Sequence, residues 1–272
     1  MKTKTGYLKL VSMQKRGKTI LKDSYAEGAF KITRPVYLTE SGEAYFYVMN
    51  PGGGYLDGDS YQLELILEER AEVFVTTQSS TKIYKTRACP ASQEMVIDLA
   101  AGSVFEYLPD PVIAYQHARF KQRTLIRMEP DASLIIADIF TPGWAPDGRF
   151  FPYDWLQSKM EVYMDGRLVL FDHVKLEPDR GINSMGFMEG YSHFGTMAVI
   201  HEQLDRDFLE ELVQWMEPLP DVRIGVSLLS VPGFSLRMLA NSTQAIENVL
   251  FGCHEVIRKK LFQKEPVFLR KY

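Results

Sequence analysis

Hydrophobic and polar positions alternate with a period of two along most of the first two thirds of the chain. Between positions 61 and 67, tyrosine or leucine occupies every second position, and Gln62 and Glu64 lie between them. This period is typical of a strand with one buried face, and we expect the segment to pair in an antiparallel sheet. Further strands are predicted at 44–49, 73–77, 95–99, 124–128 and 133–140, with a hydroxyl-rich strand at 76–84.

The clearest hairpin lies at 160–172. Two alternating segments, 160–164 and 167–172, are joined by Asp165-Gly166. Asp-Gly is favoured in a type I′ turn because both central residues need positive φ. Strands recur at short spacing with Gly, Pro and Asn between them, which indicates a sandwich, a barrel or a coiled stack of sheets rather than alternating strands and helices.

The last third of the chain changes to a helical period. Apolar residues at intervals of four predict an amphipathic helix that ends at Pro218 and Pro220; they are Leu204, Phe208, Leu212 and Met216. A second helix is predicted at 242–262, with Asn241 as its cap and Gln244 as the capping-box partner. Its last turns carry Arg258, Lys259 and Lys260, which are expected to interact with the negative end of the helix dipole.

These patterns together predict a mainly β (α+β) fold. We expect a coiled stack of antiparallel or mixed strands, covered by a C-terminal layer of about two amphipathic helices. The chain is interpreted as a single domain over 1–272, β-rich at 1–200, with the helical layer within 201–265. The best candidate boundary, 218–221, resembles a turn from a helix to a strand.

Composition excludes several classes of protein. The chain has 31 lysine and arginine residues against 35 aspartate and glutamate residues, which gives a formal net charge of −4. A protein that neutralises phosphate backbones usually has a basic excess, so no nucleic-acid partner is expected. There is no apolar run of signal-peptide or membrane-span length, and the two cysteines, Cys89 and Cys253, are far apart. We therefore expect a soluble cytoplasmic protein without a membrane partner.

Motifs for catalysis or tight metal binding are weak. Gly17-Lys18-Thr19 resembles the end of a P-loop, but Ser12 stands where the first glycine is needed, so a basic turn is predicted. None of the five histidines pairs with another at a helical spacing, so no tightly bound metal or other cofactor is expected. Four carboxylates keep a carboxylate-dependent β-sandwich hydrolase open as an alternative; they are Glu106, Asp110, Asp138 and Glu161.

Two further segments are unusual in composition. Positions 50–59 contain three consecutive glycines and end in Gly58-Asp59, which indicates either a tight loop with an acidic tip or a close approach to a partner with Asp59 directed inward. Aromatic residues are concentrated at 105–155, where they either fill a core or form a protein–protein patch. The candidate residues of that patch are Trp144, Phe150, Phe151, Tyr153 and Trp155.

Four segments, taken in order, resemble one known family. They are the Asn-Pro-x-Gly-Gly run ending at Asp59, the segment 76–84 (Thr-Thr-Gln-Ser-Ser-Thr-Lys-Ile-Tyr), the segment 106–113 (Glu-Tyr-Leu-Pro-Asp-Pro-Val-Ile) and the segment 137–143 (Ala-Asp-Ile-Phe-Thr-Pro-Gly). Their order and spacing resemble those of the urease accessory protein UreD (UreH) family. The resemblance is dense over about 20–175 and thin after 180.

The resemblance implies a non-enzymatic maturation factor with a coiled stack of strands and helices near the C-terminus. Proteins of this family bind the urease apoprotein and the accessory protein UreF, which recruits the GTPase UreG, and the assembly delivers nickel. Polar residues within the family-like segments are candidates for transient contact with nickel; they are Asp59, Thr77, Ser80, Asp110 and Asp138. Weak oxygen ligands suit an ion in transit, because a tight nitrogen and sulfur site would trap it.

Two alternatives remain for these residues. Each of them can be a turn or strand-end residue that satisfies backbone donors, and Lys82 and Arg87 can pair with the carboxylates. The whole protein can also be a scaffold that holds its partners without contacting the metal.

Overall fold

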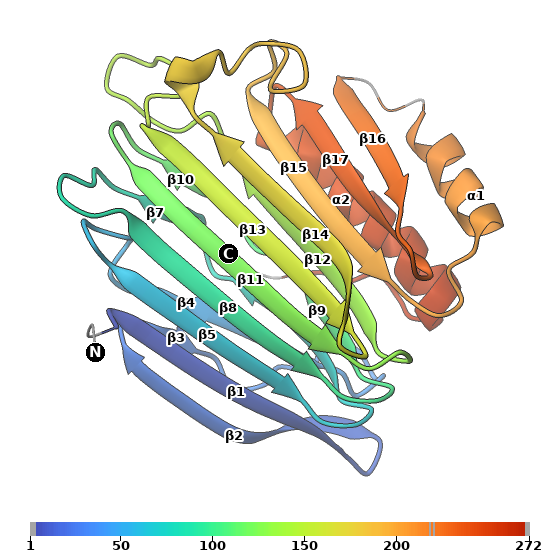
Figure 1. Ribbon diagram of the computed structural model, residues 1–272. Coiled ribbons are helices and arrows are strands. Elements are labelled where there is room, and N and C mark those ends of the chain that lie inside the picture. Colours follow the sequence, from blue (N-terminus) through green and yellow to red (C-terminus); the bar gives the residue numbers. More distant parts are fainter. Residues whose placement is uncertain (1–3, 218, 220, 270–272) are drawn as a thin grey trace.

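The strands form two sheets stacked face to face in the computed structural model, which describes residues 4–217, 219 and 221–269 (Figure 1). Sheet A has seven strands in the order β14 (Arg167–Leu176), β13 (Trp155–Met164), β11 (Arg119–Met128), β8 (Ala91–Leu99), β5 (Ser60–Leu67), β1 (Gly6–Lys15) and β2 (Lys18–Gly28). Sheet B runs in the order β16 (Val222–Leu228), β17 (Gly233–Ala240), β15 (His193–Ile200), β12 (Ser133–Phe140), β9 (Val104–Tyr107), β6 (Glu72–Thr77), β4 (Ala44–Met49) and β3 (Lys31–Ile32). The short strands β7 (Thr81–Ile83) and β10 (Val112–Ala114) join sheet B at one end.

The chain winds back and forth between the two sheets. Along the series β4, β5, β6, β8, β9, β11, β12 and β13, every step changes sheet, so neighbours within a sheet run in the same direction. β5 accordingly pairs in parallel with both β1 and β8. The predicted antiparallel pairing of 61–67 was therefore wrong, although the mainly β, coiled and stacked architecture is confirmed. Period two reports which faces are buried and carries no information about strand direction.

The main hydrophobic core lies between the sheets. Alternate residues of β5, including Leu63 and Leu65, are buried there, whereas the residues between them face outward. Parallel sheets usually have both faces covered, so the sequences of their strands are hydrophobic at nearly every position rather than at every second one. Sheet A leaves its outer face partly accessible, and this explains the clear alternation in the sequence.

Sheet B is covered on its second face by the helices α1 (Arg206–Met216) and α2 (Thr243–Ile257), with a π-helical turn at Arg258–Phe262 (Figure 1). β12 is accordingly buried along almost its whole length. The two amphipathic helices are confirmed, but β16 and β17 lie between them in sequence, so 201–265 is not helical throughout. Among the described residues, no helix has the length and apolar character needed to cross a bilayer.

The two helices begin at side-chain caps. Asp205 accepts a hydrogen bond from the backbone N–H of Phe208, and Ser242 accepts one from Ala245. The prediction of Asn241 as the second cap was wrong by one residue, because its Oδ1 accepts a hydrogen bond from Ser192 instead. The predicted capping-box partner, Gln244, donates to Asn248. Pro218 and Pro220, the predicted end of the first helix, lie outside the described residues.

Turn predictions succeeded where a specific backbone angle is required. Asp165 and Gly166 both have positive φ and join β13 to β14 as expected. The predicted continuous strand at 76–84 was wrong, because β6 ends at Thr77 and β7 begins at Thr81. The backbone changes partner there: Gln78 donates to Val48, whereas Thr81 donates to Pro111.

Candidate functional site

A cavity of about 120 Å³ lies at the end of the stack where β7 joins sheet B. The strands β7 and β10 are labelled in Figure 1. This cavity brings together the glycine run and the hydroxyl-rich segment, which are separated in the sequence. Its lining includes Gly53, Gly54, Thr77, Ser80, Lys82 and Tyr107. We call it the Gly-loop pocket.

Gly54 allows the glycine run to lie against β7. Its φ is +154°, and a Cβ atom there would lie 2.6 Å from the carbonyl oxygen of Lys82 and 2.7 Å from a ring carbon of Tyr84. No other residue type fits this contact without displacing backbone. The tyrosine hydroxyl in turn donates to the carbonyl of Gly53 at 3.4 Å. The unusual composition of 50–59 therefore reflects close packing of one loop on another.

Asp59 stabilises the end of this loop rather than lining the pocket. One carboxylate oxygen accepts a hydrogen bond from the Thr5 hydroxyl at 3.0 Å, and the other accepts one from the backbone N–H of Leu56 at 2.7 Å. Asp57 binds the backbone N–H groups of Ala88 and Cys89, and these hydrogen bonds lower the pKa of its carboxyl. The geometry of both carboxylates fits the turn-residue alternative.

Thr77 and Asp110 contact each other directly. The Thr77 hydroxyl donates to the Asp110 carboxylate at 2.8 Å and accepts from the Asp110 backbone N–H at 2.8 Å. Ser80 lies in the loop between β6 and β7 and also lines the pocket. The structure therefore brings Thr77, Ser80 and Asp110 to the same end of the molecule. Neither Lys82 nor Arg87 forms an ion pair with a carboxylate among the described residues.

Asp138 occupies a different position, between the two sheets. It projects from β12, and its Oδ2 accepts a hydrogen bond from the Gln122 side chain of β11 at 2.6 Å. The same amide group donates to the Ser158 hydroxyl of β13 at 3.0 Å. Desolvation raises the pKa of the Asp138 carboxyl to about 7, and the charge of Asp172 adds to this. In the described part of the chain, no lysine or arginine forms an ion pair with Asp138.

Tyr107 lies at the Gly-loop pocket and is near enough to Asp138 to be influenced by its charge. It is 5% exposed and lines the pocket. Burial raises the pKa of its hydroxyl, and the nearby charges of Asp138 and Asp110 raise it further. Sequence analysis missed both Tyr107 and Gln122. Gln122 had a detectable signal, since it occupies an inward position in the alternation of β11, between Phe120 and Thr124.

A second cavity, of about 290 Å³, lies between β14, β15, β16 and β17. Its lining includes Asp172, Thr196 and Arg237, and Asp172 and Arg237 form an ion pair. Thr196 is the register partner of Asp138 across β12 and β15. Polar side chains therefore lie between the sheets at three places: Tyr107 at the Gly-loop pocket, Asp138 on β12, and Thr196 beside the second cavity.

The carboxylates of the hydrolase alternative lie on different faces. Glu106 faces the helices, Asp138 lies between the sheets, and Glu161 pairs with Arg123 and Lys159 on sheet A. Asp110 is bonded to Thr77 at the end of the stack. Among the described residues, no group of three or more histidine, cysteine, aspartate or glutamate side chains is arranged to hold a metal ion. This arrangement disfavours acid–base catalysis by a pair of these carboxylates.

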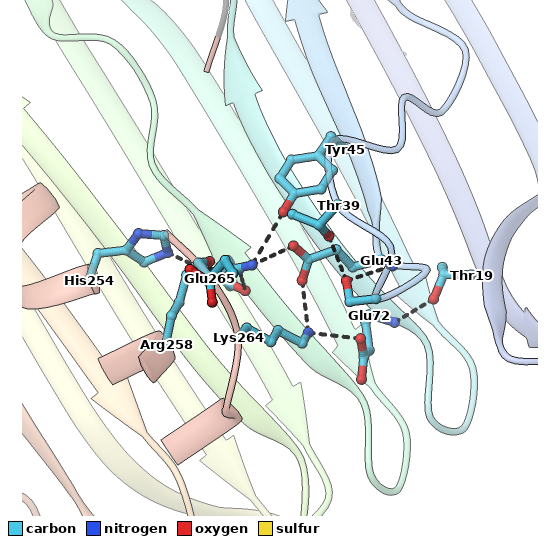
Figure 2. Close-up of polar contacts among 11 residues, drawn as sticks. Thr19, Thr39, Glu43, Tyr45, Glu72, His254, Arg258, Lys264 and Glu265 are labelled. Carbon is cyan, nitrogen blue, oxygen red and sulfur yellow. Dashed lines mark hydrogen bonds and ion pairs between the residues drawn. The ribbon is translucent and has the colours of Figure 1, made fainter. Parts of the chain in front are cut away.

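The largest concentration of buried charge joins the C-terminal helix to sheet B (Figure 2). Arg258 is fully buried and donates to Glu106 at 2.6 Å and to Glu43 at 2.5 Å. Lys264 donates to Glu43 and to Glu72, each at 2.8 Å. His254 contacts the second carboxylate oxygen of Glu106. We call these six residues the ion cluster.

The ion cluster is structural in character. Burial alone would raise the pKa of Glu106, but the hydrogen bond from His254 and the charges of His254 and Arg258 lower it to about 2. Arg258 lies at the end of α2, as expected, but no sequence pattern indicated that its side chain is buried and pairs with carboxylates of the sheet. The periodicity of a helix describes only local neighbours, so it does not reveal that Arg258 pairs with Glu106 and Glu43, which lie more than a hundred residues away in the sequence.

The predicted aromatic patch is only partly at the surface. Trp144 is 50% exposed and Phe150 is 63% exposed. Phe151 and Trp155 are partly buried, and Tyr153 is 3% exposed and belongs to the core between the sheets. The ring of Trp144 packs instead on Tyr115, with centroids 5.0 Å apart, and Tyr115 packs on Tyr84 at 4.8 Å.

Comparison with known proteins defines the class of this chain. Residues 4–271 match the family of the UreD urease accessory protein. A urease accessory protein UreD of Lachnoclostridium phytofermentans is 47% identical over 270 residues, which cover 98% of each chain. The protein of the same name from Bacillus sp. (strain TB-90) is 48% identical over 269 residues, covering 98% of this chain and 99% of the relative. That of Bacillus cereus is 38% identical over the full length of both chains. The chain belongs to the UreD family of urease accessory proteins.

Proposed function

We propose that this protein is a maturation factor that binds the urease apoprotein and links it to the accessory proteins UreF and UreG during nickel insertion. The observation that carries the proposal is the full-length match to urease accessory proteins at up to 48% identity. The dispersed carboxylates support a role without catalysis. The protein acts in the cytoplasm, and nickel is its cargo rather than a resident cofactor.

We propose further that the cargo contacts the polar residues between the two cavities. Asp138 is the central group because it is a carboxylate, has no ion-pair partner in the described chain and is surrounded by the two sheets. A carboxyl group with a pKa near 7 exchanges its proton for a cation at neutral pH. One carboxylate with amide and hydroxyl neighbours provides weak oxygen ligation, which suits an ion that must leave again.

Asp59, Thr77, Ser80 and Asp110 have a more limited part in this proposal. Thr77 and Ser80 line the Gly-loop pocket, where an ion would enter or leave the route, and Asp110 holds Thr77 in place. Asp59 holds the glycine loop through Thr5 and Leu56. We therefore assign Asp59 and Asp110 to positioning of the pocket.

The test of the maturation role is urease activity per mole of urease in cells that carry the complete urease operon. The gene for this chain is deleted and then restored, with nickel in excess and equal apoprotein confirmed by immunoblot. We expect deletion to abolish activity and restoration to recover it. Activity that is indifferent to the gene would contradict the proposal. A pure scaffold role would appear as unchanged nickel loading when Asp138 is replaced.

A further inference from the structure

The helical layer has an acidic outer face. Helix α1 lies at one edge of the molecule (Figure 1), and positions 202–217, which contain it, carry six carboxylates and one arginine. The net charge of this segment is therefore −5, compared with −4 for the whole chain. All six carboxylates are exposed. The negative charge of the protein is thus concentrated on one helix and the loop before it.

Cations of the neighbouring helix reduce this charge without cancelling it. Lys260, in the π-helical turn after α2, pairs with Glu211, and Lys259 beside it is exposed. Glu255, one turn earlier in α2, is exposed as well. When the two lysines and this glutamate are counted at full charge together with the segment 202–217, the net charge changes from −5 to −4. The outer face of the helical layer therefore stays negative with its ion pairs included.

Two aromatic rings lie where the helices meet. A Cβ atom on Gly252 of α2 would lie 2.3 Å from the indole of Trp215, so this ring crosses α2 at a position without a side chain. Trp215 is 37% exposed, and Phe251, which directly precedes the glycine, is 43% exposed. Asp207 and Glu211 precede Trp215 at intervals of four, so all three lie along one side of α1. Aromatic rings are enriched at protein interfaces, and here they lie among carboxylates.

The two helices hold this surface in one arrangement. Asp205 caps α1 by accepting a hydrogen bond from the backbone N–H of Phe208 at 2.8 Å. The ion pair between Lys260 and Glu211 joins α1 to the end of α2, and the apolar sides of both helices belong to one hydrophobic cluster on sheet B. A preorganised surface loses little conformational entropy when a partner binds.

Five residues represent this surface, which we call the acidic helical face: Asp207, Glu211, Trp215, Phe251 and Glu255. We infer that the acidic helical face is the docking surface for a protein partner whose own surface is rich in lysine and arginine. The negative charge selects such a partner, and the two rings provide the apolar contact. A second copy of this chain does not fit here, because two faces of like charge repel each other. The inference rests on the proposed function in one respect, since the partner is sought among the proteins of the urease operon.

The first test is a double charge reversal, Asp207→Lys with Glu255→Lys, in the full chain expressed with the complete urease operon. The matched control is Asp23→Lys with Glu27→Lys, which makes the same change of charge at two exposed positions of β2, the last strand of sheet A. We expect one partner, identified by mass spectrometry, to copurify about tenfold less with the first variant and unchanged with the control, which corresponds to about 1.4 kcal/mol. Loss of a partner with an acidic surface would contradict the inference.

Phe251→Ala provides an independent test that leaves the charge unchanged. Its control is Phe171→Ala, because Phe171 is 53% exposed on the outer face of sheet A. We expect the same partner, once purified, to bind the Phe251 variant more weakly than the control. Its binding to the wild-type chain should also weaken as NaCl rises from about 50 to about 500 mM, because salt screens exposed charges. Thermal unfolding of each purified variant confirms that it is folded.

Two results would overturn the inference. One is retention of every partner by both the charge-reversal variant and Phe251→Ala, even where gene deletion abolishes urease activity. The other is binding of the identified partner that does not depend on salt. Indifference of urease activity to the deletion would instead contradict the proposed function itself.

Discussion

Asp138 is the residue whose chemistry is least suited to its surroundings. It lies between two hydrophobic sheet faces and accepts a hydrogen bond from the Gln122 side chain. Asp138 is partly buried, so an ionised carboxylate in this position loses part of its hydration without gaining a cation, and its pKa rises to about 7. Groups that are unfavourable for folding are often retained for function. The stability of the protein should therefore report the protonation of this side chain.

Asp138→Asn is expected to change how stability depends on pH. The folded-state pKa of about 7 lies above the usual value of 3.8, so the folded protein holds a proton that the unfolded chain has released. Stability is therefore lost as pH rises from about 4 through about 7. The asparagine variant lacks this loss, so its stability relative to wild type should be higher at about pH 8 than at about pH 4.

Urea unfolding at the two pH values measures this difference. Asp131→Asn is the control, because Asp131 is exposed in the turn before β12. An equal effect of Asp138→Asn at both pH values would contradict the assignment of the raised pKa.

Gly54→Ala should destabilise the protein by about 1–3 kcal/mol, because the new Cβ collides with backbone as well as occupying an unfavourable φ. Gly53→Ala is the control: its φ is +77°, but nothing lies within 4 Å of its Cβ position. The difference between the two variants in chemical denaturation isolates the close approach of the loop to β7. Equal destabilisation by both would show that φ alone explains the glycine run.

Prediction of single residues from the sequence succeeded where a local backbone conformation requires a particular residue type. The positive φ values at Asp165 and Gly166 follow from the turn they form. The pairing of Thr77 with Asp110 depends on contacts across 33 positions, and no local pattern reveals it. The ion pairs of Arg258 were missed for the same reason, since its carboxylate partners lie far away in the sequence.

Helix α2 is the element whose attachment depends most on charge. Its apolar stripe packs on sheet B, and at its C-terminal end the ion cluster adds contacts from Arg258 and Lys264. A buried ion pair adds little net stability over apolar packing, but removing one partner leaves an uncompensated charge. The ion cluster therefore ties the last helix to one position on the sheet.

Arg258→Met should cost about 3–5 kcal/mol, because Glu106 and Glu43 lose their buried cation. Lys259→Met, at the exposed neighbouring position, is the control and should be near neutral. Urea unfolding of both variants provides the comparison. A near-neutral Arg258→Met would show that water reaches the cluster.

The ion cluster also sets the acid limit of stability. The pKa of Glu106 is lowered to about 2 from 4.5, so its contribution is complete above about pH 4.5 and is lost as pH falls toward about 2. Glu106→Gln should remove this part of the acid dependence, which urea unfolding at a series of pH values measures. An unchanged acid dependence in Glu106→Gln would assign the loss to other carboxylates.

The hydrophobic pattern of the sequence predicted the positions and buried faces of the strands better than it predicted which strands pair. Alternation in 61–67 gave the position of β5 and its buried face, but the winding of the chain made its neighbours parallel. The segment 76–84 has the composition of one strand, yet its backbone changes hydrogen-bonding partner within it. Gln78 donates to Val48 at the end of β4, whereas Thr81 donates to Pro111, just before β10. Pairing is a property of the whole arrangement, and composition along one segment does not contain it.

At the scale of the molecule, two sheets with an apolar interior enclose a few polar side chains, among them Tyr107, Gln122 and Asp138. The fold positions Asp138 by placing β12 opposite β11 and β13, and it positions the Gly-loop pocket at the end where the short strands gather. Membership of the UreD family accounts for the fold and for the link to urease. The single-domain interpretation and the cytoplasmic location stay predictions.

The central claim is that nickel reaches urease by way of the polar residues between the sheets. The most direct measurement is the nickel content of urease purified from cells that express Asp138→Asn in place of the wild-type chain, with Asp131→Asn as the control. The account predicts that the Asp138 variant still copurifies with urease while the nickel content of that urease falls at least about tenfold, with the control unchanged. Full nickel loading in the Asp138→Asn cells would contradict the route and leave the protein as a scaffold for its partners.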